Sequence, residues 1–270
     1  MNDLLRRKAA ELIRGGSVRV VVGYREGRRP ELPVPHFVRT VADAAGLILT
    51  PYCRGSLAVF ARREAAKAPA AFVASPEDVR ALRVLVQEKQ IPAENVRLIA
   101  FERDAAGDPT VLEGETLADF PDVRPGVDQC LDDEIARLAK MTPAERWLFW
   151  RGEFDKCIRC YACRAACPMC YCEECIADRN LPQWIEAAPL PRGSFAWNLI
   201  RAWHLAGRCV ECGACERACP QGIKLMLLNR MLAREIASEF AHVAGAGSIE
   251  EAAFFAEFKE SDRDDFILNK

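Results

Sequence analysis

Cysteine spacing constrains this sequence more than any other feature. Eleven of the thirteen cysteines lie between residues 157 and 219. Eight of them form two runs in which two, two and three residues separate successive cysteines and a proline follows the last one; the runs are Cys157–Pro168 and Cys209–Pro220. Disulfide frameworks are typical of short secreted chains, and buried structural thiols need no fixed spacing. The repeated spacing therefore predicts metal binding.

The spacing within each run is that of bacterial ferredoxins, which bind 4Fe–4S clusters. Three thiolates two residues apart let one tight loop surround a cluster, the fourth cysteine points to the other cluster, and proline keeps the loop from continuing as a helix. Zinc ribbons use cysteine pairs, often with histidine, and fit two complete runs poorly. We therefore predict two 4Fe–4S clusters with crossed ligation. Cluster 1 takes Cys157, Cys160, Cys163 and Cys219, and cluster 2 takes Cys209, Cys212, Cys215 and Cys167.

Three more cysteines, Cys170, Cys172 and Cys175, directly follow the first run and are surplus to the eight predicted ligands. One interpretation is a third iron–sulfur cluster or another metal site, with Cys53 as the fourth ligand. The other is that these thiols pack near the clusters, where they tune the potentials or have no role. Cys130 is interpreted as an ordinary helix residue.

The N-terminal part of the sequence alternates apolar strand-like segments with helical patterns, which predicts an α/β fold on a small parallel sheet. Strands are expected at 18–22, 47–49, 70–74 and 96–101, helices before Gly15 and at 35–45, 57–66 and 76–90, and a linker over 104–128.

The C-terminal part is predicted to be mainly α-helical. A capping box with proline at the first helical position begins at Thr142, and apolar residues recur at helical spacing over 195–206 and 225–240. The expected organisation is an α/β domain at 1–125, a linker or helix at 126–141, a mainly α-helical dicluster ferredoxin domain at 142–245 and a C-terminal tail at 246–270.

Composition excludes several classes of function. The formal net charge is −2, from 37 basic and 39 acidic side chains, which predicts no attraction to nucleic acid. No run of about 18 apolar residues predicts a membrane span, and the N-terminus lacks the apolar core of a secretory signal, so a cytoplasmic location is expected.

The α/β part shows no recognisable nucleotide-binding motif. No Gly-x-Gly-x-x-Gly follows a strand and no Walker loop is present. The segment Gly23–Gly27 is either a loop near a phosphate or a simple turn, and His36 and His204 are interpreted as structural. We therefore expect no catalytic residues.

The cysteine-rich segment Lys156–Cys175 resembles the iron–sulfur beta subunits of deazaflavin-reducing hydrogenases and formate dehydrogenases. Ala202–Ile223 resembles the second half of dicluster proteins that accompany heterodisulfide-reductase complexes, and residues 72–91 are similar to the N-terminal part of the same proteins. Helices around both runs suit the alpha-helical ferredoxin architecture. Ala74 and Ser75 stand where a glycine–cysteine pair is expected in relatives, so any ligand role there is absent.

The resemblance implies an electron-transfer subunit of a larger redox complex of the formate dehydrogenase, hydrogenase or heterodisulfide-reductase type. Its partner would be a flavoprotein or a molybdopterin or tungstopterin oxidoreductase. One alternative is a catalytic beta subunit that binds flavin and reduces a deazaflavin or nicotinamide, although the sequence shows no flavin fingerprint. Another is an iron–sulfur regulatory or sensor protein.

Apolar side chains in the C-terminal tail are interleaved with acidic ones. They could pack on the protein's own core or dock a partner, since interfaces favour buried aromatics. These side chains are Phe254, Phe255, Phe258, Phe266, Ile267 and Leu268.

Overall fold

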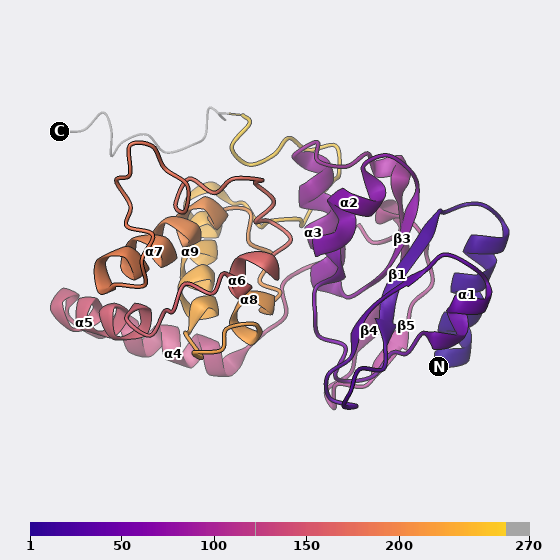
Figure 1. Cartoon of the computed structure of the whole chain (residues 1–270), viewed down its shortest axis with the longest axis horizontal. Coiled ribbons are helices and arrows are strands. Elements are labelled where there is room, and N and C mark those ends of the chain that lie inside the picture. Colours follow the sequence, from indigo (N-terminus) through magenta and orange to yellow (C-terminus); the bar gives the residue numbers. More distant parts are fainter. Residues whose placement is uncertain (122, 258–270) are drawn as a thin grey trace. The chain divides into compact units, whose positions relative to one another are not determined.

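The computed structural model describes residues 1–121 and 123–257, which fall into two compact units (Figure 1). The α/β unit comprises Met1–Pro125 together with Gly245–Ala256, and the helical unit comprises Gly126–Ala244. Phe258, Phe266, Ile267 and Leu268 of the predicted tail lie outside the described residues.

The α/β unit is built on a five-stranded sheet in the order β2-β1-β3-β4-β5. The strands are β1 (Val20–Arg25), β2 (Val34–Val38), β3 (Ala70–Ala74), β4 (Val96–Arg103) and β5 (Pro109–Val111). The pairs β1–β3 and β3–β4 are parallel, whereas β2 and β5 pair antiparallel at the two edges. The prediction of a parallel sheet is therefore wrong at its edges, where short connections return the chain as antiparallel neighbours.

Three further predictions for this part of the chain need correction. Residues 35–45 do not form one helix: Val34–Val38 is strand β2, and only Ala42–Gly46 forms a turn of 3₁₀-helix, η1. The segment predicted as a linker, 104–128, contributes β5 and the short 3₁₀-helix η4 (Leu117–Asp119). Residues 47–49 make a single bridge, between Ile48 and Tyr24, rather than a full strand.

Helices cover both faces of the central strands, with α1 (Asn2–Arg14) on one face and α2 (Ala61–Ala65) and α3 (Pro76–Gln87) on the other (Figure 1). All five residues of β3 are buried, as expected for a strand covered on both faces. The predicted helix at 76–90 is present as α3 and begins with a capping box between Ser75 and Asp78. The unit is completed by the 3₁₀-helices η2 (Leu57–Phe60) and η3 (Ala93–Asn95).

The segment 245–256 packs against α3 within the α/β unit. Arg83 Nη1 donates a hydrogen bond to the carbonyl oxygen of Gly245 over 3.3 Å. Gly245 has a φ of +68°, and a Cβ there would lie 2.3 Å from the carbonyl oxygen of Arg80. Only glycine therefore permits this close approach of two backbones.

The helical unit contains six helices and no strand among its described residues, 126–244. The helices are α4 (Gln129–Ala139), α5 (Pro143–Phe154), α6 (Ala162–Ala165), α7 (Pro191–Leu205), α8 (Ala214–Arg217) and α9 (Leu225–Phe240). The predicted capping box at Thr142 is formed with Glu145. Helix α9 packs against α4, α7 and α8, and α5 packs against α7.

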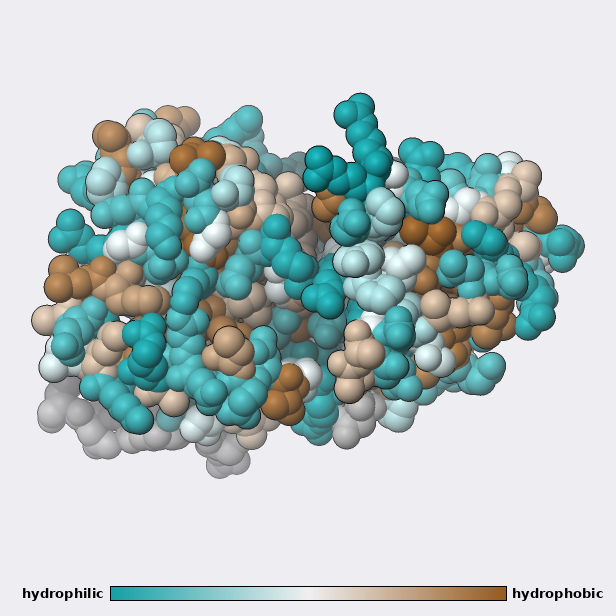
Figure 2. Space-filling model, turned by 90° about the horizontal axis from the view of Figure 1, so that it is seen from below, coloured by the Kyte–Doolittle hydropathy of each residue, from teal (hydrophilic) through white to brown (hydrophobic). Residues whose placement is uncertain are grey.

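The surface of the described residues carries no long apolar helix. None of their helices has the length and hydropathy needed to cross a bilayer. On the face drawn in Figure 2, hydrophobic side chains lie singly or in small groups among hydrophilic ones, as is usual for a protein surface.

Candidate iron–sulfur site

Both cysteine runs fold into loops with the same unusual backbone. In loop 1 (Cys157–Pro168) Arg159 and Tyr161 have φ values of 56° and 60°, and in loop 2 (Cys209–Pro220) Glu211 and Gly213 have φ values of 57° and 68°. A side chain in this left-handed region costs roughly 1–2 kcal/mol, and such strain is typical of sites that clamp a ligand. Its occurrence at matching positions indicates that both loops are shaped around the same kind of group.

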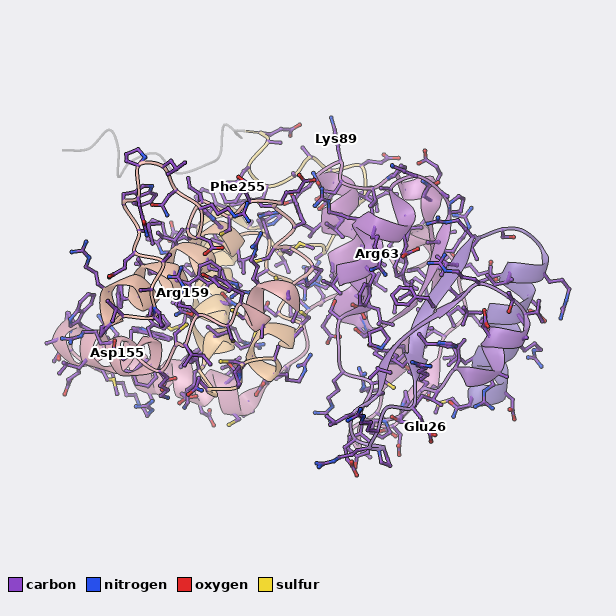
Figure 3. The ribbon with its side chains drawn as sticks, in the orientation of Figure 1. Glu26, Arg63, Lys89, Asp155, Arg159 and Phe255 are labelled. Atoms are coloured by element: carbon purple, nitrogen blue, oxygen red, sulfur yellow. The ribbon has the colours of Figure 1, made fainter. Side chains whose placement is uncertain are left out.

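Loop 1 is supported by helix α7. Arg159 is 6% exposed, donates a hydrogen bond from Nη1 to the carbonyl oxygen of Gly193 over 2.9 Å, and lies 4.9 Å from the Trp197 ring centroid (Figure 3). The hydroxyl of Ser194 donates to the carbonyl oxygen of Cys157 over 3.1 Å. Consecutive turns of α7 therefore fix the start of loop 1.

Loop 2 is supported by helix α9 and its N-terminus. Glu211 forms an ion pair with Arg230 at 3.2 Å, and a carboxylate oxygen of Glu216 accepts a hydrogen bond from the backbone N–H of Met226 over 2.7 Å. The amide of Asn229 donates to Sγ of Cys215 over 3.8 Å. Loop 2 is thus held by polar contacts to one helix.

The structure brings the last cysteine of each run near the other run. Burial raises the pKa of the Cys163 thiol; the nearby Arg201 guanidinium lowers it, and the nearby charges of Cys215, Cys157 and Cys219 raise it further. Burial likewise raises the pKa of the Cys209 thiol, and the nearby charges of Cys215, Cys167 and Cys212 raise it further. The two loops therefore lie close to one another, with Cys219 near Cys163 and Cys167 near Cys209, and the crossed ligation itself stays a prediction. Cys160 is an exposed member of loop 1.

This donor set fits iron–sulfur clusters. All thirteen cysteines are free thiols. Burial raises the pKa of the thiols of Cys163, Cys209 and Cys215, which disfavours their thiolate form. A bound metal reverses this preference, because a coordinating thiol is deprotonated outright. A site made only of sulfur donors selects soft metals and iron–sulfur clusters over hard cations. Residues from both loops would hold such groups.

The surplus cysteines have separate surroundings. Cys170 forms a hydrogen bond with Cys167, which is the main reason why the pKa of Cys170 lies below its usual value. Cys172 is exposed, and Cys175 packs beside the buried cluster of Ala177, Ile185 and Trp197. Within the part of the chain that the structure describes, no three cysteine, histidine or acidic side chains are arranged to hold a single metal ion.

Cys53 belongs to the α/β unit and is fully buried there. Its Sγ accepts a hydrogen bond from the backbone N–H of Thr50 over 3.4 Å, and burial raises the pKa of the thiol. Cys130 lies exposed on α4, the helix position expected for it. The third metal site expected from Cys53, Cys170, Cys172 and Cys175 stays a prediction.

The other residues singled out in the sequence have structural surroundings. Nε2 of His36 is 2.9 Å from the carbonyl oxygen of Asp43, and His204 is an exposed residue near the end of α7. Gly27 forms a tight turn, since a Cβ there would lie 1.9 Å from the carbonyl oxygen of Leu32.

Sequence reasoning missed Arg201. It lies on the buried stripe of α7 that also contains Trp197, Asn198 and Leu205, and it is 5% exposed. Its Nη2 donates to the carbonyl oxygen of Cys163 over 3.1 Å. The available signal was its position at helical spacing among apolar residues, because arginine is almost never fully buried unless it is paired.

Comparison with known proteins supports the interpretation of these loops. A family model described as a 4Fe–4S dicluster domain matches residues 156–224. The beta subunit of an F420-dependent formate dehydrogenase from Methanocaldococcus jannaschii is 31% identical over 96 residues, which is 36% of this chain and 25% of that protein. The beta subunit of F420-dependent formate dehydrogenase 1 from Methanococcus maripaludis is 32% identical over 57 residues, or 21% of this chain and 14% of that protein. The chain thus spans about a quarter or less of the curated relatives it matches.

Proposed function

We propose that this chain, which carries a 4Fe–4S dicluster domain over residues 156–224, relays single electrons as the iron–sulfur subunit of a larger redox complex. The observation that carries the proposal is the pair of matching left-handed loops in one helical unit, each beside the last cysteine of the other. When bound, 4Fe–4S clusters accept and return electrons one at a time.

The ligand assignment proposed for this domain is the crossed one. Cys219 of loop 2 lies close enough to raise the pKa of the Cys163 thiol, as do Cys215 and Cys157, which supports placing the last cysteine of loop 2 beside cluster 1. Cys209 is affected by Cys167, which supports placing the last cysteine of loop 1 in cluster 2. The proposed ligands are Cys157, Cys160, Cys163 and Cys219 for cluster 1 and Cys209, Cys212, Cys215 and Cys167 for cluster 2.

The protein's own residues have three roles in this proposal. Helices α7 and α9 hold the loops through Ser194 and Asn229 and so fix where the thiolates point. The stacked rings of Trp150 and Phe154, whose centroids lie 5.5 Å apart, pack in the buried core beside loop 2 and would exclude water from it. The exposed start of loop 1 at Ile158, 52% exposed, offers a short path to a partner.

The partner proposed for the chain is a flavoprotein or a molybdopterin or tungstopterin oxidoreductase. The two matched relatives are named as beta subunits of F420-dependent formate dehydrogenases, which supports a complex of that type. The words F420-dependent in those names favour one alternative, a catalytic beta subunit that reduces a deazaflavin; in the expectation from the sequence such a subunit would bind flavin itself.

Anaerobic isolation of the native complex tests the proposal. We expect the chain to copurify with a second subunit that contains flavin or a pterin-bound metal. The dithionite-reduced chain should be reoxidised by that subunit and should reduce neither F420 nor nicotinamide alone. An isolated chain that contains stoichiometric flavin and reduces F420 at enzyme-like rates would establish the alternative.

A further inference from the structure

One buried guanidinium lies among cysteines of both loops. Arg201 donates to the carbonyl oxygen of Cys163 in loop 1 and forms side-chain hydrogen bonds with the thiols of Cys170 and Cys215, the latter in loop 2. Its side chain therefore extends from α7 to the region shared by the two proposed clusters.

The guanidinium of Arg201 is buried with one donor left over. The residue is 5% exposed, and among residues 1–121 and 123–257 its Nε–H has no hydrogen-bond acceptor. A buried arginine with an unpaired donor points to an anionic ligand at this place, and the sulfur-lined region between the two loops is where the proposed clusters would supply that charge.

We propose that Arg201 is a positioning residue whose positive charge is shared by the two clusters and raises the reduction potential of both. The inference rests on the proposed function and its ligand assignment. Each cluster gains one negative charge when it takes up an electron, and no bond is formed or broken. A positive charge in a buried, low-dielectric site favours the more negative, reduced form.

The position of Arg201 explains why both potentials should move together. It contacts Cys163, a proposed ligand of cluster 1, and Cys215, a proposed ligand of cluster 2. Arginine suits this place because its planar fork has five donors and can reach acceptors on two sides at once, whereas lysine carries a single point charge.

The test is a redox titration of anaerobically loaded full-length protein, followed by electron paramagnetic resonance. Arg201→Gln should lower both midpoint potentials by at least about 59 mV, which corresponds to a tenfold change in the one-electron equilibrium constant. In Arg201→Lys both equilibrium constants should stay within tenfold of their wild-type values. The matched control is Arg192→Gln, which removes the same charge from an exposed position at the start of α7, about 13 Å along the helix.

Several results would overturn the inference. An Arg201→Gln protein with a full iron content and both midpoints unchanged, or only one of them changed, removes the shared role. If Arg201→Gln does not load, Arg201→Lys decides: wild-type-like midpoints support the role of the charge, whereas two strongly lowered midpoints contradict it. Failure of both variants to load would make Arg201 a purely structural residue.

These outcomes are separable from failure of the proposed function. A wild-type chain that holds both clusters but exchanges no electrons with a partner would break the relay proposal and leave the role of Arg201 open to the same titration. Unchanged potentials in Arg201→Gln would break only the inference about Arg201.

Discussion

The two cysteine loops share a backbone but differ in what surrounds it. At the second intervening position loop 1 has the buried cation Arg159, and loop 2 has the acid Glu211, paired with Arg230. At the first position Ile158 is 52% exposed and Val210 only 2%. Cysteine spacing thus determines the shape of each loop, and the residues between the cysteines determine its charge and access to solvent. Cluster 1 is expected to have the higher potential and the more exposed edge.

The largest expected effect comes from removing the cysteines that cross between the loops. Cys219→Ser should damage cluster 1, and Cys167→Ser should damage cluster 2, because each variant removes a thiolate from the opposite loop. Iron content should fall from about eight to about four atoms per chain, as expected for loss of one 4Fe–4S unit. Paramagnetic resonance of the reduced variants identifies the remaining cluster.

Cys130→Ser is the control for this experiment, because Cys130 is exposed on α4 and belongs to neither run. It should retain the full iron content. If Cys167→Ser perturbs only the cluster of loop 1, the ligands are not crossed, and each cluster takes all four of its ligands from one loop.

A smaller effect is expected from the left-handed position that differs between the loops. Gly213→Ala should destabilise loop 2 by about 1–2 kcal/mol because an L side chain is disfavoured at this φ of 68°. The new Cβ would also lie 2.6 Å from Nη1 of Arg217, which must move. Thermal unfolding of the loaded protein measures the change.

Gly152→Ala is a suitable control, since a Cβ there meets nothing within 4 Å and Gly152 lies inside helix α5. That variant should be neutral or slightly more stable. An unaffected Gly213→Ala protein would show that the loop relaxes to another backbone when the clusters are bound.

Charge replacement within the loops should bring the two cluster potentials closer together, with a smaller effect than the changes above. Arg159→Gln should lower the potential of cluster 1, and Glu211→Gln should raise that of cluster 2, because removing a positive charge disfavours the reduced form and removing a negative charge favours it. Each shift should be less than tenfold in the one-electron equilibrium, or less than about 59 mV. Redox titration of the two variants, with Arg159→Lys as the charge-preserving control, measures both. Shifts of the same sign would contradict the assigned environments.

The smallest effect concerns access to loop 1. Ile158→Lys places a charge on the exposed edge of loop 1 and should slow electron exchange with the partner several-fold, without changing iron content. Ile176→Lys makes the same change at a side chain of similar exposure, 53%, in the same unit. Stopped-flow reoxidation by the isolated partner compares the two. Equal rates would mean that electrons leave elsewhere.

The sequence predicted the 4Fe–4S dicluster domain more fully than it predicted the sheet, because the two depend on different kinds of interaction. Ligand spacing is local covalent geometry, so the loops around Cys157 and Cys209 could be identified from two short runs. Strand β2 was mistaken for a helix because its conformation depends on pairing with β1, where Pro35 lies opposite Tyr24. An edge strand tolerates this proline, but nothing within residues 35–45 reveals the neighbour.

Arg201 shows the same limit within the site. An arginine at helical spacing among apolar residues was the available signal. The identity of its neighbours depends on how α7 packs against both loops, which the sequence does not show. Strand β5 was hidden in a segment rich in glycine and proline, and Pro109 at its first residue is a position that a sheet edge accepts. Pairing or packing with a neighbouring element, which the local sequence pattern does not reveal, therefore accounts for each miss.

Iron and acid-labile sulfide analysis of anaerobically purified protein tests the central claim most directly. Two 4Fe–4S clusters predict about eight atoms of each per chain, with two separate one-electron reductions. Values near twelve would add a third cluster on the surplus cysteines. Stoichiometric zinc in place of iron, or a single cluster with about four irons, would contradict the account of two interlocked loops.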